Sequence, residues 1–353
     1  MGRNCGLVMF VLLACQGGAA PPQYKVTNLG LLPSNAVGGK INSFTSNDRI
    51  IVAPRNGVDN LPPFLHTKGS LVNLRAQWSS GYISPYIYTN DSGNFLDPDN
   101  IFFDHAGSEA LYLHPNLEFS TSIYANGMTD RYVYGAELDT PHSQTYTGGY
   151  YYEIATGEYH YIDPFLDNQN TVVLAMTNSG YMAVARGPGQ RWVSGDPPAP
   201  IEIWKDGVKL KNSGVTLDEV YMNSKGQFGG VNLVDQNFFT IFDGATATKY
   251  SARFDGKLYR FVGMSDDGTA LMHNDTSTFR SRLFKDGNWY SWQQACPELG
   301  TMEVGHGVMR DDGSVAAIGL QGGKGYLLRF DPVPEPASIL ALGAGLALVA
   351  RRR

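Results

Sequence analysis

Tyrosines lie close together in one stretch near the middle of the chain, residues 146–161, where six of sixteen residues are Tyr. A phenol ring that exposes one face and its hydroxyl can stack on a sugar or join a partner surface. Alternatively, alternate rings fill the space between packed sheets as core residues. From the first interpretation we predict a ligand-binding set made of Tyr150, Tyr151, Tyr152, Tyr159 and Tyr161.

Carboxylates gather in a second stretch, around Pro98. Asp97, Asp99 and Asp104 together offer the oxygen ligands that Ca²⁺ binds. The stretch lacks the glycine and the downstream glutamate of an EF-hand loop, so a plain Asp-Pro turn is the simpler interpretation. Calcium is the only cofactor that the sequence suggests.

The sequence holds no motif of a familiar catalytic centre. There is no H-E-x-x-H, no G-x-S-x-G and no Walker loop, and none of the seven histidines has a second histidine at metal-ligand spacing. Carboxylate pairs for glycoside cleavage are available from Glu153, Glu158, Asp163 and Asp167, but nothing selects two of them. No catalytic residue is predicted, and whether the protein is an enzyme stays open.

Charge excludes one class of partner. Four of the 27 basic residues are Arg3 and Arg351 to Arg353, so the chain between Tyr24 and Pro336 carries 23 basic and 33 acidic residues. An acidic surface repels phosphate backbones, and we therefore predict no binding to nucleic acid.

A polar turn followed by a short apolar strand recurs along the body of the chain. Five copies end in glycine, four of them in Asx-x-Gly or Asp-Gly, the residues that suit a hairpin turn, and two copies are degenerate. Anchored at residues 49, 93, 131, 180, 226, 268 and 313, the copies lie about 44 residues apart. A second hairpin pattern, seen at Ile201–Val208 and Arg282–Trp289, runs in phase with the first.

Two hairpins per period of this length give four strands per repeat, which is typical of a β-propeller blade. We predict an all-β chain with a propeller of seven four-stranded blades over residues 24–331. The last repeat lacks a return strand before Pro332, and the segment Tyr24–Leu29 can supply it, closing the ring. A pair of β-sandwiches or a β-solenoid are the alternative folds.

The N-terminal segment, residues 1–20, has the pattern of a secretory signal peptide: Arg3, an apolar stretch and small residues at the exit. Leu12 to Cys15 also resembles a lipoprotein box, in which Cys15 would be acylated, and this alternative stays open. Ordinary cleavage leaves Cys296 as the only cysteine, so no intramolecular disulfide is expected.

The C-terminal segment, residues 332–353, has three parts in order. Pro334, Glu335 and Pro336 are followed by fourteen uncharged residues and by the basic tail Arg351, Arg352 and Arg353. Fourteen helical residues span about 21 Å, short of a hydrocarbon core of about 30 Å. The apolar part therefore suits a temporary transmembrane helix, with the arginines on the cytoplasmic side.

These three parts closely resemble the PEP-CTERM sorting signal of Gram-negative bacteria that make exopolysaccharide. The resemblance implies recognition by an exosortase, a membrane processing enzyme, removal of the tail, and a destination at the cell surface or outside the cell. The opening, Tyr24–Gly30 with Gly38–Asn42, also resembles an extracellular HAF-type repeat.

Together these patterns indicate an exported, non-catalytic surface or extracellular-matrix protein. Exopolysaccharide is the partner that the sorting signal suggests, with protein partners as a second possibility. The alternative is a secreted hydrolase or lyase that acts on polysaccharide, because the loops of a propeller can host either activity.

Overall fold

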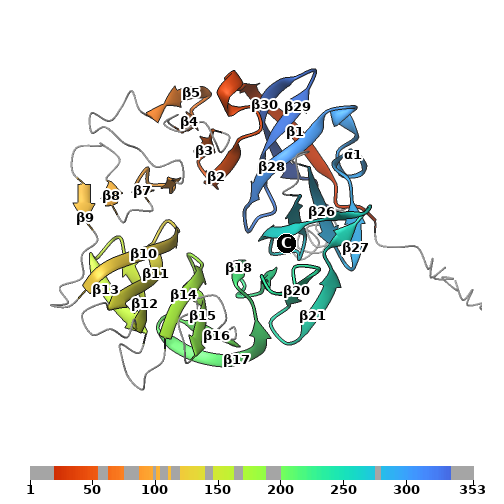
Figure 1. Cartoon of the computed structure of the whole chain (residues 1–353). Coiled ribbons are helices and arrows are strands. Elements are labelled where there is room, and N and C mark those ends of the chain that lie inside the picture. Colours follow the sequence, from red (N-terminus) through yellow and green to blue (C-terminus); the bar gives the residue numbers. More distant parts are fainter. Residues whose placement is uncertain are drawn as a thin grey trace, which may run out of the picture.

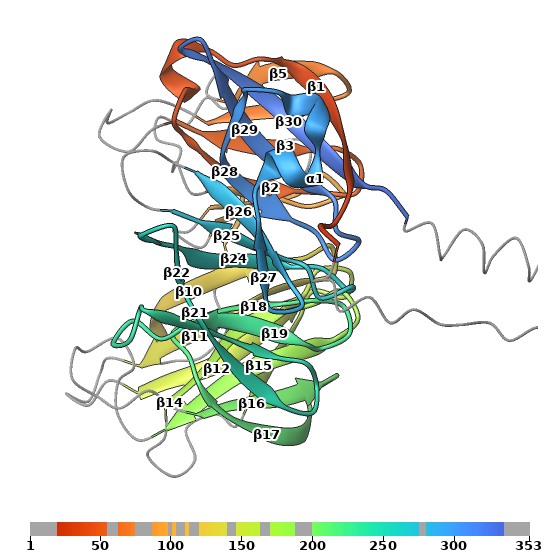
Figure 2. The ribbon, with the colours of Figure 1, turned by 90° about the vertical axis from the view of Figure 1, so that its right-hand side faces the viewer.

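The computed structural model describes residues 20–54, 63–74, 87–97, 101–103, 110–112, 120–139, 146–162, 170–187, 200–274 and 280–334. In these residues antiparallel sheets follow one another around a central channel, and strand order within each sheet follows chain order, apart from the ring closure (Figure 1). This arrangement is a β-propeller, which confirms the predicted fold class. Seen from the side, the sheets form a thick disc (Figure 2).

Six sheets are complete blades with strands of three to nine residues. The first and third repeats give β2 (Lys40–Phe44), β3 (Ile50–Ala53), β4 (Phe64–Thr67) and β5 (Ser70–Asn73), then β10 (Ser120–Met128), β11 (Tyr132–Asp139), β12 (Tyr146–Glu153) and β13 (Glu158–Ile162). The next two give β14 (Asn170–Met176), β15 (Tyr181–Gly187), β16 (Pro200–Lys205) and β17 (Val208–Thr216), then β18 (Glu219–Met222), β19 (Phe228–Val231), β20 (Phe238–Phe242) and β21 (Ala247–Ser251). The last two give β24 (Arg260–Met264), β25 (Ala270–His273), β26 (Ser281–Lys285) and β27 (Asn288–Tyr290), then β28 (Glu303–Met309), β29 (Val315–Gln321), β30 (Lys324–Pro332) and β1 (Tyr24–Leu31).

The prediction of seven four-stranded blades is wrong in its count: six complete blades are found, and the second repeat is the exception. Its sheet is made of four strands of only two or three residues: β6 (Tyr88–Thr89), β7 (Phe95–Asp97), β8 (Ile101–Phe103) and β9 (Ala110–Tyr112). This repeat is the shortest, 38 residues between the anchors at 93 and 131, and β7 ends directly before Pro98, which has no N–H for a ladder. The ring therefore has six complete blades and one reduced sheet.

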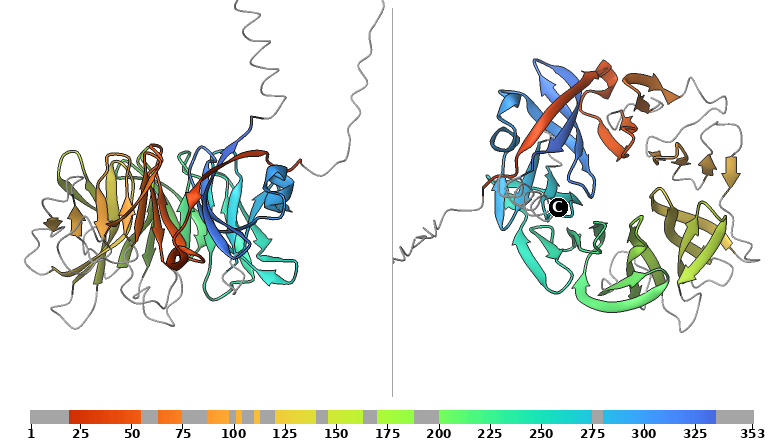
Figure 3. Two further views of the ribbon diagram at one scale, coloured as in Figure 1. Left: turned by 90° about the horizontal axis from the view of Figure 1, so that it is seen from above. Right: turned by 180° about the vertical axis from the view of Figure 1, so that it is seen from behind.

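The ring closes through its two ends, as predicted. β1 pairs with β30 in antiparallel register from Tyr24 opposite Pro332 to Leu31 opposite Tyr326. The Tyr24 ring is buried and packs edge-on against Trp292, with the two ring centroids 5.6 Å apart. Views from above and behind show β1 lying along the outside of this last blade (Figure 3).

Apolar side chains between neighbouring blades form the core. In the cluster between the β10–β13 and β14–β17 blades, for example, Tyr132 and Tyr151 pack with Val173 and Met182. Glycine is required where two blades approach closely, because a Cβ atom on Gly226 would lie 2.6 Å from the ring of Tyr181 in the neighbouring blade.

Short elements complete the described part of the chain: the two-stranded hairpin β22 (Arg253–Phe254) with β23 (Lys257–Leu258), the helix α1 (Trp292–Ala295), and the 3-10 turns Ser34–Ala36 and Pro297–Leu299. No helix among the described residues is long and apolar enough to cross a membrane. The predicted C-terminal transmembrane helix, the signal peptide with Cys15, and residues Glu335 onward lie outside the described residues.

Candidate functional site

The repeat turns gather at one mouth of the central channel, each at the end of the innermost strand of its sheet. In all seven, the N–H of the first turn residue donates to a carbonyl three or four residues later, as from Thr177 to Tyr181. The first turn residues are Thr45, Asn90, Thr129, Thr177, Asn223, Ser265 and Arg310. The turns therefore place equivalent side chains at equivalent heights around the channel.

The residue before each turn lines the channel wall. In five repeats it is methionine and in the other two it is Phe44 or Thr89; the methionines are Met128, Met176, Met222, Met264 and Met309. Methionine is flexible and polarizable, so such a wall can adapt to the shape of an apolar surface.

The second turn residue of each repeat belongs to a ring of hydrogen bonds between blades, which we call the belt. Its members are Ser46, Asp91, Asp130, Asn178, Ser224, Asp266 and Asp311. Successive members are 39 to 48 residues apart in sequence, and their hydrogen bonds join the turns of adjacent blades.

In the first half of the belt, carboxylates take hydrogen bonds from the neighbouring turns. Asp91 accepts from the Ser46 hydroxyl and, at 2.7 Å, from the N–H of Asn47. Asp130 accepts from the N–H of Asp91 at 2.6 Å and from the side-chain amide of Asn178 at 3.0 Å. Both oxygens of each carboxylate are thus engaged in holding turns together.

In the second half, backbone atoms make more of the links. The Ser179 hydroxyl donates to the Ser224 carbonyl at 2.8 Å, and the N–H of Asp266 donates to the Asp311 carbonyl at 2.7 Å. Asp266 accepts from the Ser224 hydroxyl at 2.5 Å. The belt closes where Arg310 Nη1 donates to the Thr45 carbonyl at 3.3 Å.

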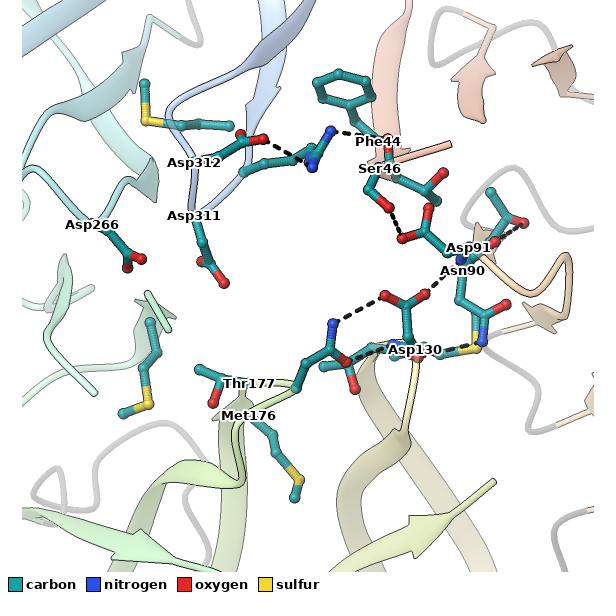
Figure 4. Close-up of a pocket in the computed structure, with 18 residues that line it drawn as sticks. Phe44, Ser46, Asn90, Asp91, Asp130, Met176, Thr177, Asp266, Asp311 and Asp312 are labelled. Carbon is teal, nitrogen blue, oxygen red and sulfur yellow. Dashed lines mark hydrogen bonds and ion pairs between the residues drawn. The ribbon is translucent and has the colours of Figure 1, made fainter. Parts of the chain in front are cut away.

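The belt surrounds a cavity of about 490 Å³ at the channel mouth. Among its lining residues, five carboxylates face one guanidinium, that of Arg310; the carboxylates are Asp91, Asp130, Asp266, Asp311 and Asp312 (Figure 4). A second cavity of about 520 Å³ shares the methionine wall and continues into the channel. The mouth is therefore polar and acidic, with methionine side chains along its wall.

Asp311 has the most perturbed acidity at this mouth. Burial, and then the carboxylates of Asp266 and Asp312, raise the pKa of Asp311 to about 6, against the opposing effects of Arg310 and the Ser224 N–H. Since a carboxylic acid with this pKa changes charge near neutral pH, the mouth holds one group that titrates in that range.

The two tied carboxylates titrate differently from one another. Burial acts to raise the pKa of Asp91, but hydrogen bonds from Ser46 and Asn47 outweigh it and hold that pKa below its ordinary value. Burial, together with the neighbouring Asp91 carboxylate, raises the pKa of Asp130. The hydrogen bonds therefore favour the charged form of Asp91, whereas burial and the Asp91 charge disfavour that of Asp130.

The predicted tyrosine set lies elsewhere, on β12 and β13. Tyr150, Tyr151 and Tyr152 are buried, and Tyr159 and Tyr161 are half-buried. Tyr151 packs edge-on against Tyr132 of the next strand, and Tyr152 packs against Tyr159. The rings of Tyr150, Tyr152, Tyr159 and Tyr161 lie together on one face of the sheet, whereas Tyr151 lies on the other face and stacks on His160. Ligand binding by these tyrosines stays a prediction.

The calcium candidates lie outside what the structure describes: Asp99 and Asp104 entirely, and Asp97 in its side chain. Within the described residues, no group of three or more His, Cys, Asp or Glu side chains is arranged to hold a metal ion. Cys296 is fully buried, and burial raises the pKa of its thiol.

The channel-mouth carboxylates were not predicted as a site, although their turns carried the repeat. Asp266 and Asp311 stand in Asp-Asp-Gly turns whose spacing is explained by hairpin geometry alone. The available signal was that acidic and amide residues occupy the same repeat position, which in a propeller puts them all at one mouth.

A family model supplies the first likeness to known proteins. Residues 332–353 match the PEP-CTERM protein-sorting motif. The chain carries a PEP-CTERM sorting signal. A protein with this signal is exported across the inner membrane, is processed by the membrane enzyme exosortase, and reaches the cell surface or the exterior after processing. The PEP-CTERM segment begins at Pro332, the last residue of β30, so the sorting signal follows the closing strand pair directly.

No curated protein matches the sequence. Among solved structures the chain is similar to a streptogramin B lyase, at 9% identity over 88% of this chain and 98% of that one, with a TM-score of 0.44. It is also similar to oligogalacturonate lyase from Vibrio parahaemolyticus (14% identity, 88% and 94% covered, TM-score 0.43) and to YCF48 bound to D1 peptide (10% identity, 90% and 99% covered, TM-score 0.45).

Proposed function

We propose that the exported propeller is a non-catalytic binding protein of the cell surface or extracellular matrix, and that its ligand, an exopolysaccharide, enters the channel-mouth cavity. The observation that carries this proposal is the cavity itself. Its volume of about 490 Å³ lies within the usual range of ligand pockets.

The lining suits a sugar. The rim presents hydroxyl, amide and carboxylate groups from the belt, which can exchange hydrogen bonds with sugar hydroxyls. The methionine wall and Phe44 offer apolar surface to the C–H face of a sugar ring.

The belt also supports a non-catalytic role. Asp91 and Asp130 accept hydrogen bonds from neighbouring turns on both carboxylate oxygens. Groups that hold the ring in this way are poorly placed to act as nucleophile or base, because either role would break a link between blades.

Asp311 supports a second candidate, a hydrolase that cleaves polysaccharide. A carboxylic acid with a pKa of about 6 beside the carboxylates of Asp266 and Asp312 is the kind of unequal pair that glycoside cleavage uses. One measurement distinguishes the two candidates: the length of the glycan after it has been mixed with the protein.

The test uses protein recovered from a host that exports and processes it, titrated against exopolysaccharides by calorimetry, with the glycan then sized by chromatography. Saturable binding with unchanged glycan length supports the binding protein, and shortening of the glycan supports the hydrolase.

A cavity-filling variant locates the site. Met222→Trp places a bulky ring in the channel without removing a belt hydrogen bond, and we expect it to weaken binding at least about tenfold. Phe238→Trp, on a partly exposed ring outside the cavity, is the matched control. Unchanged affinity in the Met222→Trp protein would place the ligand elsewhere and overturn the proposal.

A further inference from the structure

The charges around the channel-mouth cavity do not balance. Arg310, the only cation among the lining residues, already pairs with Asp312 at 2.9 Å and donates to the Thr45 carbonyl. Asp91, Asp130, Asp266 and Asp311 then face the cavity with no lining cation of their own. Carboxylates that share a concave, partly apolar site focus a negative potential, and this potential raises the local concentration of cations.

One wall of the cavity also holds an acceptor that lacks a donor. The Oδ1 atom of Asp266 is buried and has no hydrogen-bond partner, while its Oδ2 atom accepts from Ser224. On the adjacent turn the Asp311 side chain points into the cavity (Figure 4). Because the Asp266 Oδ1 atom has almost no exposed surface, the carboxylate on this wall that a ligand reaches is that of Asp311, to which a ligand N–H can donate a charge-assisted hydrogen bond.

The spread of these carboxylates around the ring argues for a large cation. No group of three or more His, Cys, Asp or Glu residues in the described part of the chain is arranged around a single metal-sized point. Acceptors on several blades instead fit a ligand that carries several N–H and O–H donors across the mouth, with an apolar face toward the methionines.

We propose that the cavity selects saccharide chains that carry protonated amines, in preference to neutral or uronate chains. This inference rests on the proposed function and names the ligand class of the same site. Uronates bring carboxylates to an acidic mouth and are repelled, and neutral sugars leave the negative potential unused.

Three probes of equal length test it: a chitosan hexasaccharide, the fully N-acetylated chitin hexasaccharide and a hexagalacturonate. Chitosan and chitin share one backbone and differ in the amine charge. By calorimetry at neutral pH, where Asp311 is largely ionised, we expect chitosan to bind at least about tenfold more tightly than chitin, and hexagalacturonate not to bind.

Asp311→Asn removes one negative charge with little change of shape. We expect it to weaken chitosan binding about fivefold and to leave chitin binding unchanged. Asp286→Asn makes the same charge change in an exposed hairpin turn outside the cavity and is the matched control, with chitosan affinity as in the wild type.

Equal affinity for chitosan and chitin, or an Asp311→Asn protein with unchanged chitosan affinity, overturns the inference. Tighter binding of a hexalysine peptide than of chitosan also overturns it, in favour of a basic protein partner. These results differ from failure of the proposed function: if binding is lost in the Met222→Trp protein but charge makes no difference, the site stands and the ligand class is wrong.

Discussion

The two halves of the belt use the same repeat position in different ways. Asp91 and Asp130 each accept hydrogen bonds on both carboxylate oxygens, and those bonds hold four successive turns together. Asp266 and Asp311 stand at the same turn position in the last two blades of the ring. There a backbone hydrogen bond joins the turns, one Asp266 oxygen lacks a partner, and the Asp311 side chain points into the cavity.

The difference shows that the same turn geometry, repeated in each blade, does not determine which partners the side chain at the second turn position binds. Where the neighbouring turn offers an N–H or amide, the carboxylate becomes part of the scaffold. Where a backbone hydrogen bond already joins the turns, the carboxylates make fewer links: Asp266 accepts from the Ser224 hydroxyl, Asp311 interacts with the Ser224 N–H, and the Asp311 side chain still points into the cavity. Four substitutions or conditions test this division.

The largest loss of stability is expected when ring closure is weakened, because both halves of the belt depend on a closed ring. Tyr24→Ala removes a buried ring that packs against Trp292 and Phe330. We expect a loss of about 3–5 kcal/mol in the free energy of unfolding, measured by denaturant titration. Tyr221→Ala, at a partly exposed ring in the channel, is the control. Equal losses in the two proteins would show that closure is not a special contact.

The second-largest effect is expected from a comparison of Asp130 with Asp311: replacing Asp130 should lower the free energy of unfolding more than replacing Asp311. Asp130→Ala removes acceptors for Asp91 and Asn178, and we expect a loss of about 2 kcal/mol. Asp311→Ala removes a carboxylate whose charged form is disfavoured by burial, so we expect a change below about 1 kcal/mol at neutral pH. Denaturant titration of both proteins under one set of conditions makes the comparison. If the Asp311→Ala loss were as large as that of Asp130→Ala, the division would fail.

Acidity provides the third test. The folded-state pKa of Asp311, about 6, lies above its ordinary value of 3.8, so the folded protein binds this proton more tightly than the unfolded chain does. Its contribution therefore favours folding at low pH, and is lost as pH rises from about 4 through 6, to a total of about 3 kcal/mol.

The measurement is a series of unfolding titrations across this pH range. We expect the wild type to lose this stability with rising pH and Asp311→Asn not to show that loss. Asp267 is the opposite case: hydrogen bonds from Ser265, Lys285 and Thr269 outweigh burial and lower its pKa to about 2, so its contribution is lost only as pH falls below about 4. A pH slope that survives in the Asp311→Asn protein would assign it to another group.

The smallest effect is expected at the tyrosine set. Tyr159 is half-buried and packs on Tyr152, so Tyr159→Ala exposes little new surface at the channel mouth. We expect glycan affinity to change less than about twofold, measured by the same calorimetry as for Met222→Trp. A loss of about tenfold instead would support the tyrosines as the ligand site and would move the binding surface from the channel to the β10–β13 blade.

The sequence alone determined the features that are local or periodic. The PEP-CTERM signal is a run of adjacent residues, and the blade repeat follows from turn residues whose backbone preferences act over four or five positions. Ring closure by Tyr24–Leu31 was also accessible, since a missing strand at one end matched a spare strand at the other.

Only the tertiary structure decided the rest. The second repeat forms strands of only two or three residues. Its short length and Pro98 were visible in the sequence, but the average repeat length of about 44 residues did not show their effect on the strands. Burial of Tyr150, Tyr151 and Tyr152 depends on which sheet face meets the next blade. The acidic mouth joins Asp91, Asp130, Asp266 and Asp311, which are 39 to 220 residues apart, and hydrogen bonding and desolvation act through space. The closed ring alone brings these carboxylates close enough to share one cavity.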